Sequence, residues 1–358
     1  MSEDTNYQAI EWKAEKLILL DQRKLPQSLE YIHYEDALSV ATAIREMVVR
    51  GAPAIGITAA YAVVLSAQQH SKDQKQNSEG WRQAVLADID VLQAARPTAV
   101  NLAWALQRMK NCLQAINNDQ NPQALLLALA QKIHAEDIDA NARMSRYGAE
   151  LISGAKKHVI THCNTGPLAT GGIGTALGVI SQAYREQRIS GVFADETRPW
   201  LQGARLTSWE LLQQGIPVQL ICDSAAASMM KQGDVSWAIV GADRITANGD
   251  AVNKIGTYSL AIVAKHHGVK FMVVAPSSTV DMNTACGDEV TIENRPAAEV
   301  THVANVAIAP SQVNALNPAF DVTPAQLIDA IVTEVGVVLA PNREKMAKLM
   351  VSEAGASD

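Results

Sequence analysis

The sequence predicts an α/β protein with a mainly helical N-terminal domain, residues 1–150, and a doubly wound parallel sheet in a C-terminal domain, residues 151–358. The length of 358 residues suits two domains, at roughly 150 residues per domain. Hydrophobic residues make up 48% of the chain, so a sizeable core can be buried. Near residue 150 the helical periodicity gives way to short apolar runs that alternate with helices.

Composition excludes several classes of protein. The 30 Lys and Arg residues against 37 Asp and Glu residues give a net charge of −7, so no overall positive field would attract nucleic acid. The four cysteines show no metal-type pairing, which fits a reducing compartment. The polar start lacks the order of a signal peptide, and the apolar part of residues 54–69 is too short to span a membrane. We therefore expect a cytoplasmic protein without a membrane or nucleic-acid partner.

The N-terminal domain is expected to begin with a small β element. A hairpin is predicted over residues 11–23 and a third short strand over residues 29–32. Asp36 is a suitable N-cap for a helix over residues 37–49, since Gly51 and Pro53 mark its end. Further helical patterns cover residues 55–69, 80–94, 99–116, 122–132 and 135–151.

The C-terminal domain alternates strands with helices. The apolar runs that predict strands are residues 158–162, 191–194, 217–221, 237–240 and 270–274. The helical patterns between them are residues 172–187, 203–214, 224–231 and 256–267. Such strands indicate a parallel sheet covered on both faces, and right-handed crossovers make it doubly wound. Ligands bind such sheets beyond the carboxyl ends of the strands.

Four of the five predicted strands end in reactive or charged groups, which should converge on one crevice. Cys163 follows the first strand and Asp243 the fourth. Cys163 could be a small buried hydrophobe, but at a strand end nearby N–H groups or a basic residue would favour a thiolate. Asp243 could simply cap its strand beside Arg244, or, partly desolvated, could transfer protons.

A glycine-rich stretch follows the first predicted strand. Gly172, Gly174 and Gly178 imitate a dinucleotide fingerprint. A true fingerprint begins directly at the strand end, whereas residues 163–170 intervene here, which argues against a dinucleotide cofactor. A phosphate at this helix start remains physically reasonable, because exposed N–H groups and the helix dipole favour an anion.

Basic residues at other helix starts complete the candidate site. Arg50 and Gly51 precede a helical pattern, and an Arg beside bare N–H groups suits a phosphate. The alternative is an Arg that binds the last carbonyls of the preceding helix. Arg96 is a similar, weaker candidate, while Lys254 lies just before the last helical pattern and could offset phosphate charge.

Several long motifs together resemble the methylthioribose-1-phosphate isomerase family, which is related to the regulatory subunits of eukaryotic initiation factor 2B. The resemblance covers nearly the whole chain. The motifs that carry it are Arg50-Gly51-Ala52-Pro53-Ala54-Ile55-Gly56, His162-Cys163-Asn164-Thr165-Gly166, residues 196–207, Gly241-Ala242-Asp243-Arg244-Ile245 and residues 317–324.

The resemblance implies an aldose–ketose isomerisation of 5-methylthio-α-ribose 1-phosphate in methionine salvage. It also implies a Rossmann-like C-terminal domain, a homodimer, and no metal or other cofactor. Cys163 and Asp243 match the catalytic pair of the family. The positions that match substrate-binding residues are Arg50, Gly51, Ala52, Arg96, Gln202, Asn253 and Lys254.

Two alternatives remain open at this point. Relatives of the family act on ribose 1,5-bisphosphate or 5-deoxyribose 1-phosphate, which differ only at C5. A non-catalytic protein like the initiation-factor subunits would be expected to lack the pair of Cys163 and Asp243, and this chain has both.

Overall fold

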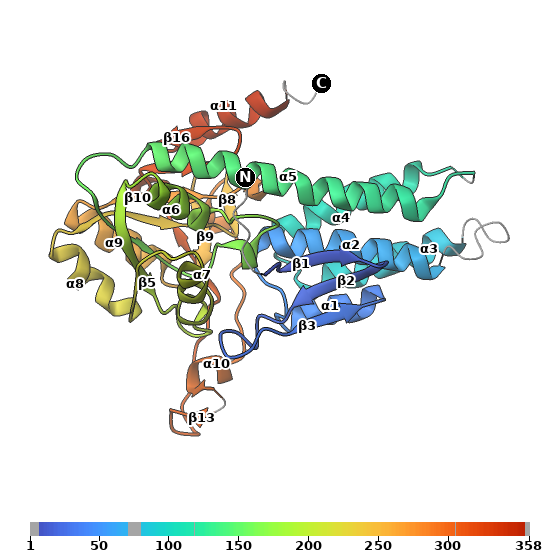
Figure 1. The fold of residues 1–358 in the computed structure, drawn as a ribbon, viewed down its shortest axis with the longest axis horizontal. Helices are drawn as coiled ribbons and strands as arrows, with labels where there is room; N and C mark the ends of the chain where they lie inside the picture. The colour runs from blue at the N-terminus through green and yellow to red at the C-terminus, as the bar shows by residue number, and fades with distance from the viewer. Residues whose placement is uncertain (1–6, 71–79, 118, 305, 355–358) are drawn as a thin grey trace. The chain divides into compact units, whose positions relative to one another are not determined.

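The computed structural model describes residues 7–70, 80–117, 119–304 and 306–354 (Figure 1). The chain divides into two compact units. The N-terminal unit consists of Met1–Asn141 and Gly166–Gly174, and the C-terminal unit of Ala142–Thr165 and Thr175–Asp358. The backbone therefore passes from one unit to the other three times.

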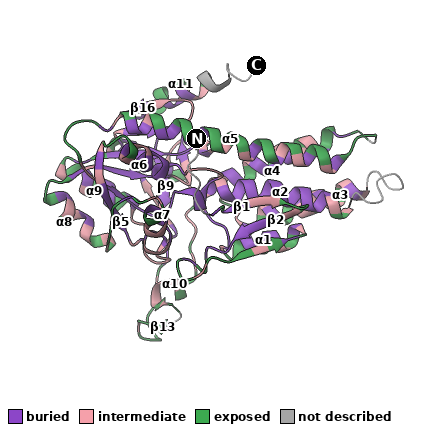
Figure 2. Cartoon of the chain, viewed as in Figure 1, coloured by how far each residue is buried: buried purple, intermediate pink, exposed green. Residues whose placement is uncertain are grey.

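The N-terminal unit combines a three-stranded sheet with helices. The strands β1 (Ile10–Lys13), β2 (Lys16–Leu20) and β3 (Tyr31–Tyr34) pair antiparallel in the order β1-β2-β3. The helices are α1 (Ala37–Arg45), α2 (Ala52–His70), α3 (Gly80–Ala95), α4 (Val100–Ala115) and most of α5 (Pro122–Glu150). Helix α2 is buried along most of its length because α1, α3 and α4 all pack against it (Figure 2).

Local signals in the sequence fix several of these elements. The side chain of Asp36 accepts a hydrogen bond from Ser39 N, which confirms it as the N-cap of α1. Helix α1 ends at Arg45, earlier than the expected residue 49, and β3 lies two residues later than predicted. The two helices expected over residues 122–132 and 135–151 are one continuous helix, α5, because no Pro or Gly separates them.

A seven-stranded sheet forms the core of the C-terminal unit, with the order β16-β15-β10-β7-β4-β5-β6. Its strands are β4 (Lys157–Thr161), β5 (Ile189–Asp195), β6 (Val218–Ile221), β7 (Val235–Val240), β10 (Lys270–Val274), β15 (Ala330–Val332) and β16 (Val337–Leu339). Only the edge strand β16 pairs antiparallel within this sheet. The six parallel strands have the strand order of the Rossmann fold, and the order reverses between β4 and β7.

Helices and short turns connect and cover this sheet. The α-helices are α6 (Ala176–Arg185), α7 (Ser208–Gln213), α8 (Ala226–Lys231), α9 (Thr257–His267), α10 (Ala298–Thr301) and α11 (Arg343–Ala354). A π-helical turn, η3 (Gly203–Thr207), leads into α7. Helix α6 contacts β5 and β7, while α9 contacts β7 and β10. The central strands are almost wholly buried, so the predicted α/β class with a doubly wound parallel sheet is confirmed.

Two smaller sheets in this unit were not predicted. One has the order β11-β8-β9-β14, with β8 (Arg244–Thr246), β9 (Ala251–Lys254), β11 (Val280–Asp281) and β14 (Phe320–Thr323). The other pairs β12 (His302–Val303) with β13 (Val306–Ala307). The first sheet lies next to Asp243, because β8 begins at the following residue and β9 is the next strand along the chain.

The unit boundary falls inside α5, between Asn141 and Ala142, whereas the sequence suggested a division near residue 150. The last turns of α5 pack within the C-terminal unit. A Cβ on Gly148 would lie 2.4 Å from Val179 Cγ2 of α6, so α5 and α6 are in close contact there. The expected domain limits stay a prediction, since a continuous helix gives the sequence no break at which to divide it.

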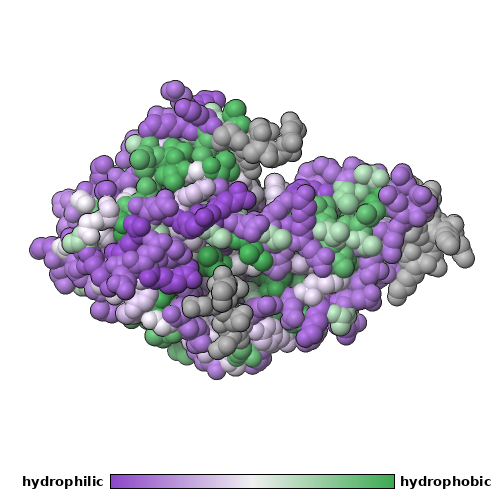
Figure 3. Space-filling view, turned by 45° about the horizontal axis from the view of Figure 1, so that its top comes forward, coloured by the Kyte–Doolittle hydropathy of each residue, from purple (hydrophilic) through white to green (hydrophobic). Residues whose placement is uncertain are grey.

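Polar and apolar side chains are mixed over the surface. Figure 3 shows hydrophobic residues gathered in patches between larger hydrophilic areas on one face. Among the helices of the described residues, none is both long and apolar enough to cross a lipid bilayer.

Candidate active site

Cys163 and Asp243 lie beyond the two strands where the sheet order reverses. Cys163 follows β4 and Asp243 follows β7, and these strands are neighbours. The loops that leave them also touch, since a Cβ on Gly241 would lie 2.7 Å from Thr165 Cγ2. This is the place in a doubly wound sheet where ligands bind.

The backbone at Cys163 is held in an unfavourable conformation. Its φ of 66° lies in the left-handed region, which non-glycine residues rarely adopt. Two threonine hydroxyls hold it there: Cys163 N donates to Thr197 Oγ1 (2.8 Å), and Thr207 Oγ1 donates to Cys163 O (2.6 Å). The residue is 6% exposed. Strain of this kind, maintained by surrounding hydrogen bonds, is typical of functional sites.

Thr197 is itself fixed from two sides. Its hydroxyl donates to the main-chain oxygen of Asp195 (3.1 Å), and its N–H donates to Asp223 Oδ1 (2.7 Å). Asp223 Oδ2 accepts the next N–H, that of Arg198 (2.8 Å). Thr197 also has a positive φ of 63°, which is exceptional for a β-branched residue. The turn after β5 is therefore built to present one hydroxyl to Cys163.

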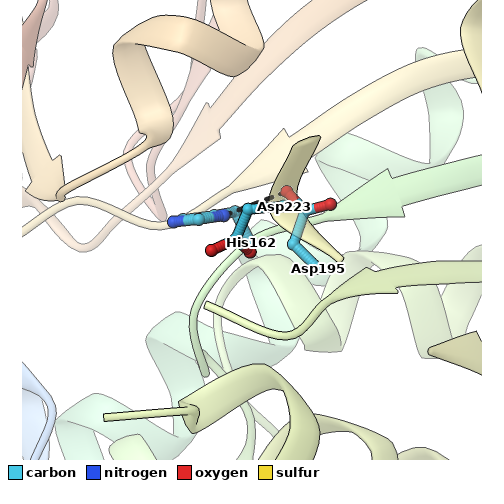
Figure 4. A group of neighbouring side chains, drawn as sticks. All are labelled: His162, Asp195 and Asp223. Carbon is cyan, nitrogen blue, oxygen red and sulfur yellow. Dashed lines mark hydrogen bonds and ion pairs between the residues drawn. The ribbon is translucent and has the colours of Figure 1, made fainter. Parts of the chain in front are cut away.

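His162, the residue before Cys163, forms a buried pair with Asp195. The two side chains are 1% and 2% exposed, and Nδ1 lies 3.0 Å from Asp195 Oδ2 (Figure 4). The other ring nitrogen, Nε2, lies 2.9 Å from the carbonyl oxygen of Ile255. A carbonyl can only accept, so Nε2 carries a proton.

Burial and charge shift the titration of this pair. Burial lowers the pKa of His162, but the hydrogen bond and charge of Asp195 outweigh it, and the net result is a raised pKa. Burial also raises the pKa of Asp195, against the opposing influence of His162. Both shifts favour keeping a proton between the two groups.

His162, Asp195 and Asp223 place three oxygen or nitrogen atoms within 4.8 Å of one another, a spacing that a cation could share. The contacts that these residues make are hydrogen bonds to protein groups instead. Both ring nitrogens of His162 face protein oxygens, and both carboxylate oxygens of Asp223 accept backbone N–H groups. We therefore treat the three residues as a hydrogen-bonded group.

Two polar residues after Cys163 are also anchored. Asn164 Nδ2 donates to the fully buried carboxylate of Glu210 and to Thr207 Oγ1. Thr165 Oγ1 accepts from Leu177 N (3.2 Å), so it caps the start of α6. The start of α6 follows the glycine-rich stretch that the sequence suggests as a phosphate site. One of its N–H groups is already hydrogen-bonded to the hydroxyl of Thr165.

The remaining candidates of the C-terminal unit surround the same strand ends. Gln202, at the start of η3, is 3% exposed, and its Oε1 has no hydrogen-bond partner within the described residues. Asn253 and Lys254 end β9. Asn253 Nδ2 donates to Thr257 Oγ1 (3.0 Å), while Lys254 Nζ donates to Ala319 O (3.0 Å).

Four further candidates belong to the N-terminal unit. Arg50 and Gly51 lie directly before α2, and Ala52 is its first residue. Gly51 has a φ of 95°, and a Cβ there would lie 2.5 Å from Ala169 Cβ, so only glycine fits. Arg50 is buried, and Arg96 is half-buried in the turn between α3 and α4.

Sequence reasoning did not assign roles to the residues that hold Cys163. Asp195 and Asp223 follow the strands predicted over residues 191–194 and 217–221, and His162 is part of a motif, but the sequence alone does not show that they are partners. Their contacts depend on which strands are neighbours in the sheet, which single-sequence patterns leave open. The available signal was position: His162 follows β4, Asp195 ends the adjacent strand β5, and Asp223 follows β6, one strand further.

Comparison with known proteins agrees with the motifs. The family model described as Initiation factor 2 subunit family matches residues 48–340. A protein of Thioalkalivibrio sulfidiphilus (strain HL-EbGR7), named methylthioribose-1-phosphate isomerase, is 58% identical over 342 residues, which cover 96% of each chain. One of the same name from Nitrosococcus oceani is 56% identical, over 97% of this chain and 99% of the relative. The resemblance drawn from the sequence is thereby confirmed.

Solved structures give two further matches. The 5-methylthioribose 1-phosphate isomerase of Pyrococcus horikoshii OT3 is 40% identical with a TM-score of 0.87, covering 97% of this chain and 99% of that chain. A protein described as translation initiation factor eIF-2B, subunit delta, from A. fulgidus is also 40% identical, with a TM-score of 0.83 and coverage of 96% and 100%.

Proposed function

The chain belongs to the initiation factor 2 subunit family, and from that premise we propose that it is an aldose–ketose isomerase. Its reaction converts 5-methylthio-α-D-ribose 1-phosphate to 5-methylthio-D-ribulose 1-phosphate, a step of methionine salvage. The observation that carries the proposal is the identity of 58%, over 96% of each chain, with a relative named for this activity. The presence of both Cys163 and Asp243 at the reversal of the sheet order supports it.

The substrate sets a specific chemical problem. Its anomeric carbon carries phosphate, so the ring cannot open spontaneously to an aldehyde as a free aldose does. An acid must protonate the departing ring oxygen, and hydrogen must move from C2 to C1. A carboxyl and a thiol on adjacent strand ends offer one proton donor and one base for these steps.

We assign the acid to Asp243 and the base to Cys163. Asp243 donates a proton to the ring oxygen as its bond to C1 breaks, and the Cys163 thiolate removes the proton from C2. The electrons of that C–H bond form a C1–C2 double bond, which gives a phosphate-bearing enediol whose deprotonated form is the enediolate. The Cys163 thiol then gives a proton to C1 while the C2 hydroxyl gives its proton to the Asp243 carboxylate, which leaves a carbonyl at C2. The backbone that carries the thiol is held in place throughout these steps by hydrogen bonds. They come from Thr197 and Thr207 and, through Thr197, from Asp195.

The family resemblance supports a substrate-binding role for seven residues. In the C-terminal unit these are Gln202, Asn253 and Lys254, and in the N-terminal unit Arg50, Gly51, Ala52 and Arg96. The unpartnered Oε1 of Gln202 is an acceptor suited to a sugar hydroxyl. The arginines and Lys254 suit the phosphate. We further propose a cytoplasmic homodimer that needs no metal or other cofactor.

The test is an assay of purified protein on three sugar phosphates: 5-methylthioribose 1-phosphate, 5-deoxyribose 1-phosphate and ribose 1,5-bisphosphate. We expect the highest kcat/KM on the methylthio sugar. A preference for the bisphosphate would reassign the substrate, since a second phosphate needs an additional basic pocket.

Isotope labelling separates two mechanisms. Turnover in deuterated water should place deuterium at C1 of the product if an enediolate forms. A product without deuterium indicates a direct hydride shift from C2 to C1, or a transfer fully shielded from solvent. In a hydride shift, Cys163 and Asp243 would only stabilise charge.

A non-catalytic regulatory protein is the second candidate. The structural match to a protein described as an initiation-factor delta subunit favours it. Lack of turnover on all three sugar phosphates by well-folded protein would support this alternative.

A further inference from the structure

The ring of His162 joins two segments that the proposed reaction uses. One is the turn of Cys163, because His162 is the preceding residue. The other is the turn after Lys254, because Nε2 donates to the carbonyl oxygen of Ile255 (2.9 Å). Ile255 directly follows Asn253 and Lys254 in the chain, so the ring bonds next to residues assigned to the substrate.

Asp195 closes a ring of contacts around Cys163. Its side chain binds His162 Nδ1 (3.0 Å), and its main-chain oxygen accepts the hydroxyl of Thr197 (3.1 Å). That hydroxyl in turn accepts from Cys163 N (2.8 Å). One residue of β5 therefore holds both His162 and, through Thr197, its neighbour Cys163.

The imidazole of His162 also lies close to the backbone of Gly256. Gly256 has a φ of 103°, and a Cβ there would lie 2.8 Å from His162 Cε1. The ring can therefore approach this turn only because the residue is glycine. Asp321 holds the same turn independently, accepting from Gly256 N (2.8 Å) and Tyr258 N (3.1 Å).

The buried pair of His162 and Asp195 is costly to maintain, so a contribution to stability alone does not explain it. Asp195 is 2% exposed, and its second carboxylate oxygen, Oδ1, has no hydrogen-bond partner among the described residues. Replacing a buried ionisable pair by apolar residues is often neutral or stabilising. A pair that leaves one carboxylate oxygen unsatisfied beside a reactive thiol therefore points to a functional role.

We propose that His162, held by Asp195, is a positioning residue that fixes the Cys163 turn and the Asn253–Lys254 turn in one arrangement. The assignment rests on the proposed isomerase function and extends it to residues that touch no substrate. Because each ring nitrogen bonds a different segment, the two bonds serve different parts of the site. The Nδ1 bond secures the thiol, and the Nε2 bond secures the substrate-binding turn.

Two substitutions can remove these bonds one at a time. In His162→Asn the amide can reach the position of Nδ1, so it keeps the bond to Asp195 and loses that to Ile255. In His162→Gln the amide can reach the position of Nε2, so the reverse holds. His162→Ala loses both bonds. The matched control is His158→Gln, which alters a histidine at the other end of β4 whose Nδ1 likewise faces a carboxylate, that of Asp234.

The expected result is a split between the kinetic constants. His162→Asn should mainly raise KM, and His162→Gln should mainly lower kcat, each by about 10- to 100-fold, the scale expected when reacting groups are misplaced by about 1 Å. His162→Ala should show both effects, and His158→Gln neither. Melting temperatures of all four variants report folding separately. If His162→Ala does not fold, the comparison of His162→Asn with His162→Gln still tests the positioning role.

A second measurement does not depend on the substrate. Iodoacetamide should label Cys163 severalfold faster in His162→Gln than in the wild type, with the exposed Cys222 as internal reference. Wild-type kinetics together with wild-type labelling in the Asn and Gln variants would overturn the positioning role. So would equal changes in kcat and KM in both variants that merely follow a fall in melting temperature.

The two proposals can fail separately. If the wild type turns over none of the three sugar phosphates, the proposed function is wrong, and the labelling of Cys163 alone then tests the positioning role. If the wild type is active and the variants of His162 match it in kinetics and labelling, the function stands and the positioning role falls.

Discussion

The stretch that follows β4 is held in two different ways. Its first part, Cys163–Thr165, belongs to the C-terminal unit, and its second part, Gly166–Gly174, to the N-terminal unit. In the first part, buried hydroxyls and carboxylates hold a backbone with an unfavourable φ of 66° at Cys163. In the second part, side chains from distant segments bind an otherwise relaxed loop.

The contacts of the second part are simpler. Gln22 Nε2 donates to Leu168 O (2.7 Å), and Gly171 N donates to Asp137 Oδ2 (2.7 Å). His134 Nε2 lies 3.1 Å from Gly171 O. A Cβ on Gly171 would lie 2.6 Å from His134 Cδ2, so the loop is fixed by close approach as well.

The first part of this stretch, Cys163–Thr165, and the second part, Gly166–Gly174, are therefore held by different kinds of interaction. Hydrogen bonds impose a strained conformation on Cys163, so removing one bond should change turnover as well as stability. Close packing holds the glycine stretch, so changes there should act on stability first. Four sets of substitutions test this distinction.

The largest effect is expected from the reacting groups themselves. Cys163→Ser and Asp243→Asn should each abolish measurable turnover while leaving the melting temperature close to that of the wild type. Cys222→Ser, at an exposed position, is the control and should keep full activity. Full activity in either of the first two variants would refute the assigned pair.

Gly203→Ala should cause the largest loss of stability. Its Cβ would lie 1.6 Å from the main-chain oxygen of Asp195, and backbone cannot move aside as a flexible side chain does. We expect a loss of roughly 3 kcal/mol in the free energy of unfolding, measured by urea denaturation. Gly215→Ala is the control for the clash, because no atom lies within 4 Å of a Cβ added there, and only the positive φ of 66° disfavours alanine. That change should cost only about 1 kcal/mol.

Thr197→Val should separate chemistry from stability. The substitution keeps the shape but removes the hydroxyl that accepts from Cys163 N, leaving a buried N–H without that bond. We expect a loss of about 1–3 kcal/mol in stability and at least a tenfold fall in kcat, on the scale of small misplacements. Thr197→Ser keeps the hydroxyl and should recover most of the kcat. Equal kcat in Val and Ser variants would contradict the role given to this hydroxyl.

The smallest effect concerns pH and the glycine stretch. Burial lowers the pKa of His134 from its ordinary 6.5, only partly offset by its bond to Gly171. The unfolded chain therefore binds a proton more readily, and stability should fall as pH drops below about 6.5 towards the folded pKa. His134→Gln, which can still donate to Gly171 O, should show a weaker fall over this window in urea denaturation at several pH values. An unchanged pH dependence would show that His134 does not contribute.

Strand periodicity was enough to place Cys163 and Asp243 at the functional edge of the sheet. The reason is that parallel strands bring their carboxyl ends together whatever their order. It was not enough to find the role of Thr197, because a hydroxyl two residues beyond a strand carries no signal until its neighbour is known. Strands as short as β8, with three residues, were likewise hidden within a loop that ends in polar residues.

The three backbone crossings between the units set an order of events during synthesis. The N-terminal unit includes Gly166–Gly174, which its own residues Gln22, His134 and Asp137 bind. It therefore cannot be completed until the ribosome has made residue 174, by which time β4 and the Cys163 turn already exist as free chain. A fragment that stops at Asn141 would lack this stretch, so the N-terminal unit can finish folding only after the first part of the C-terminal unit has been made.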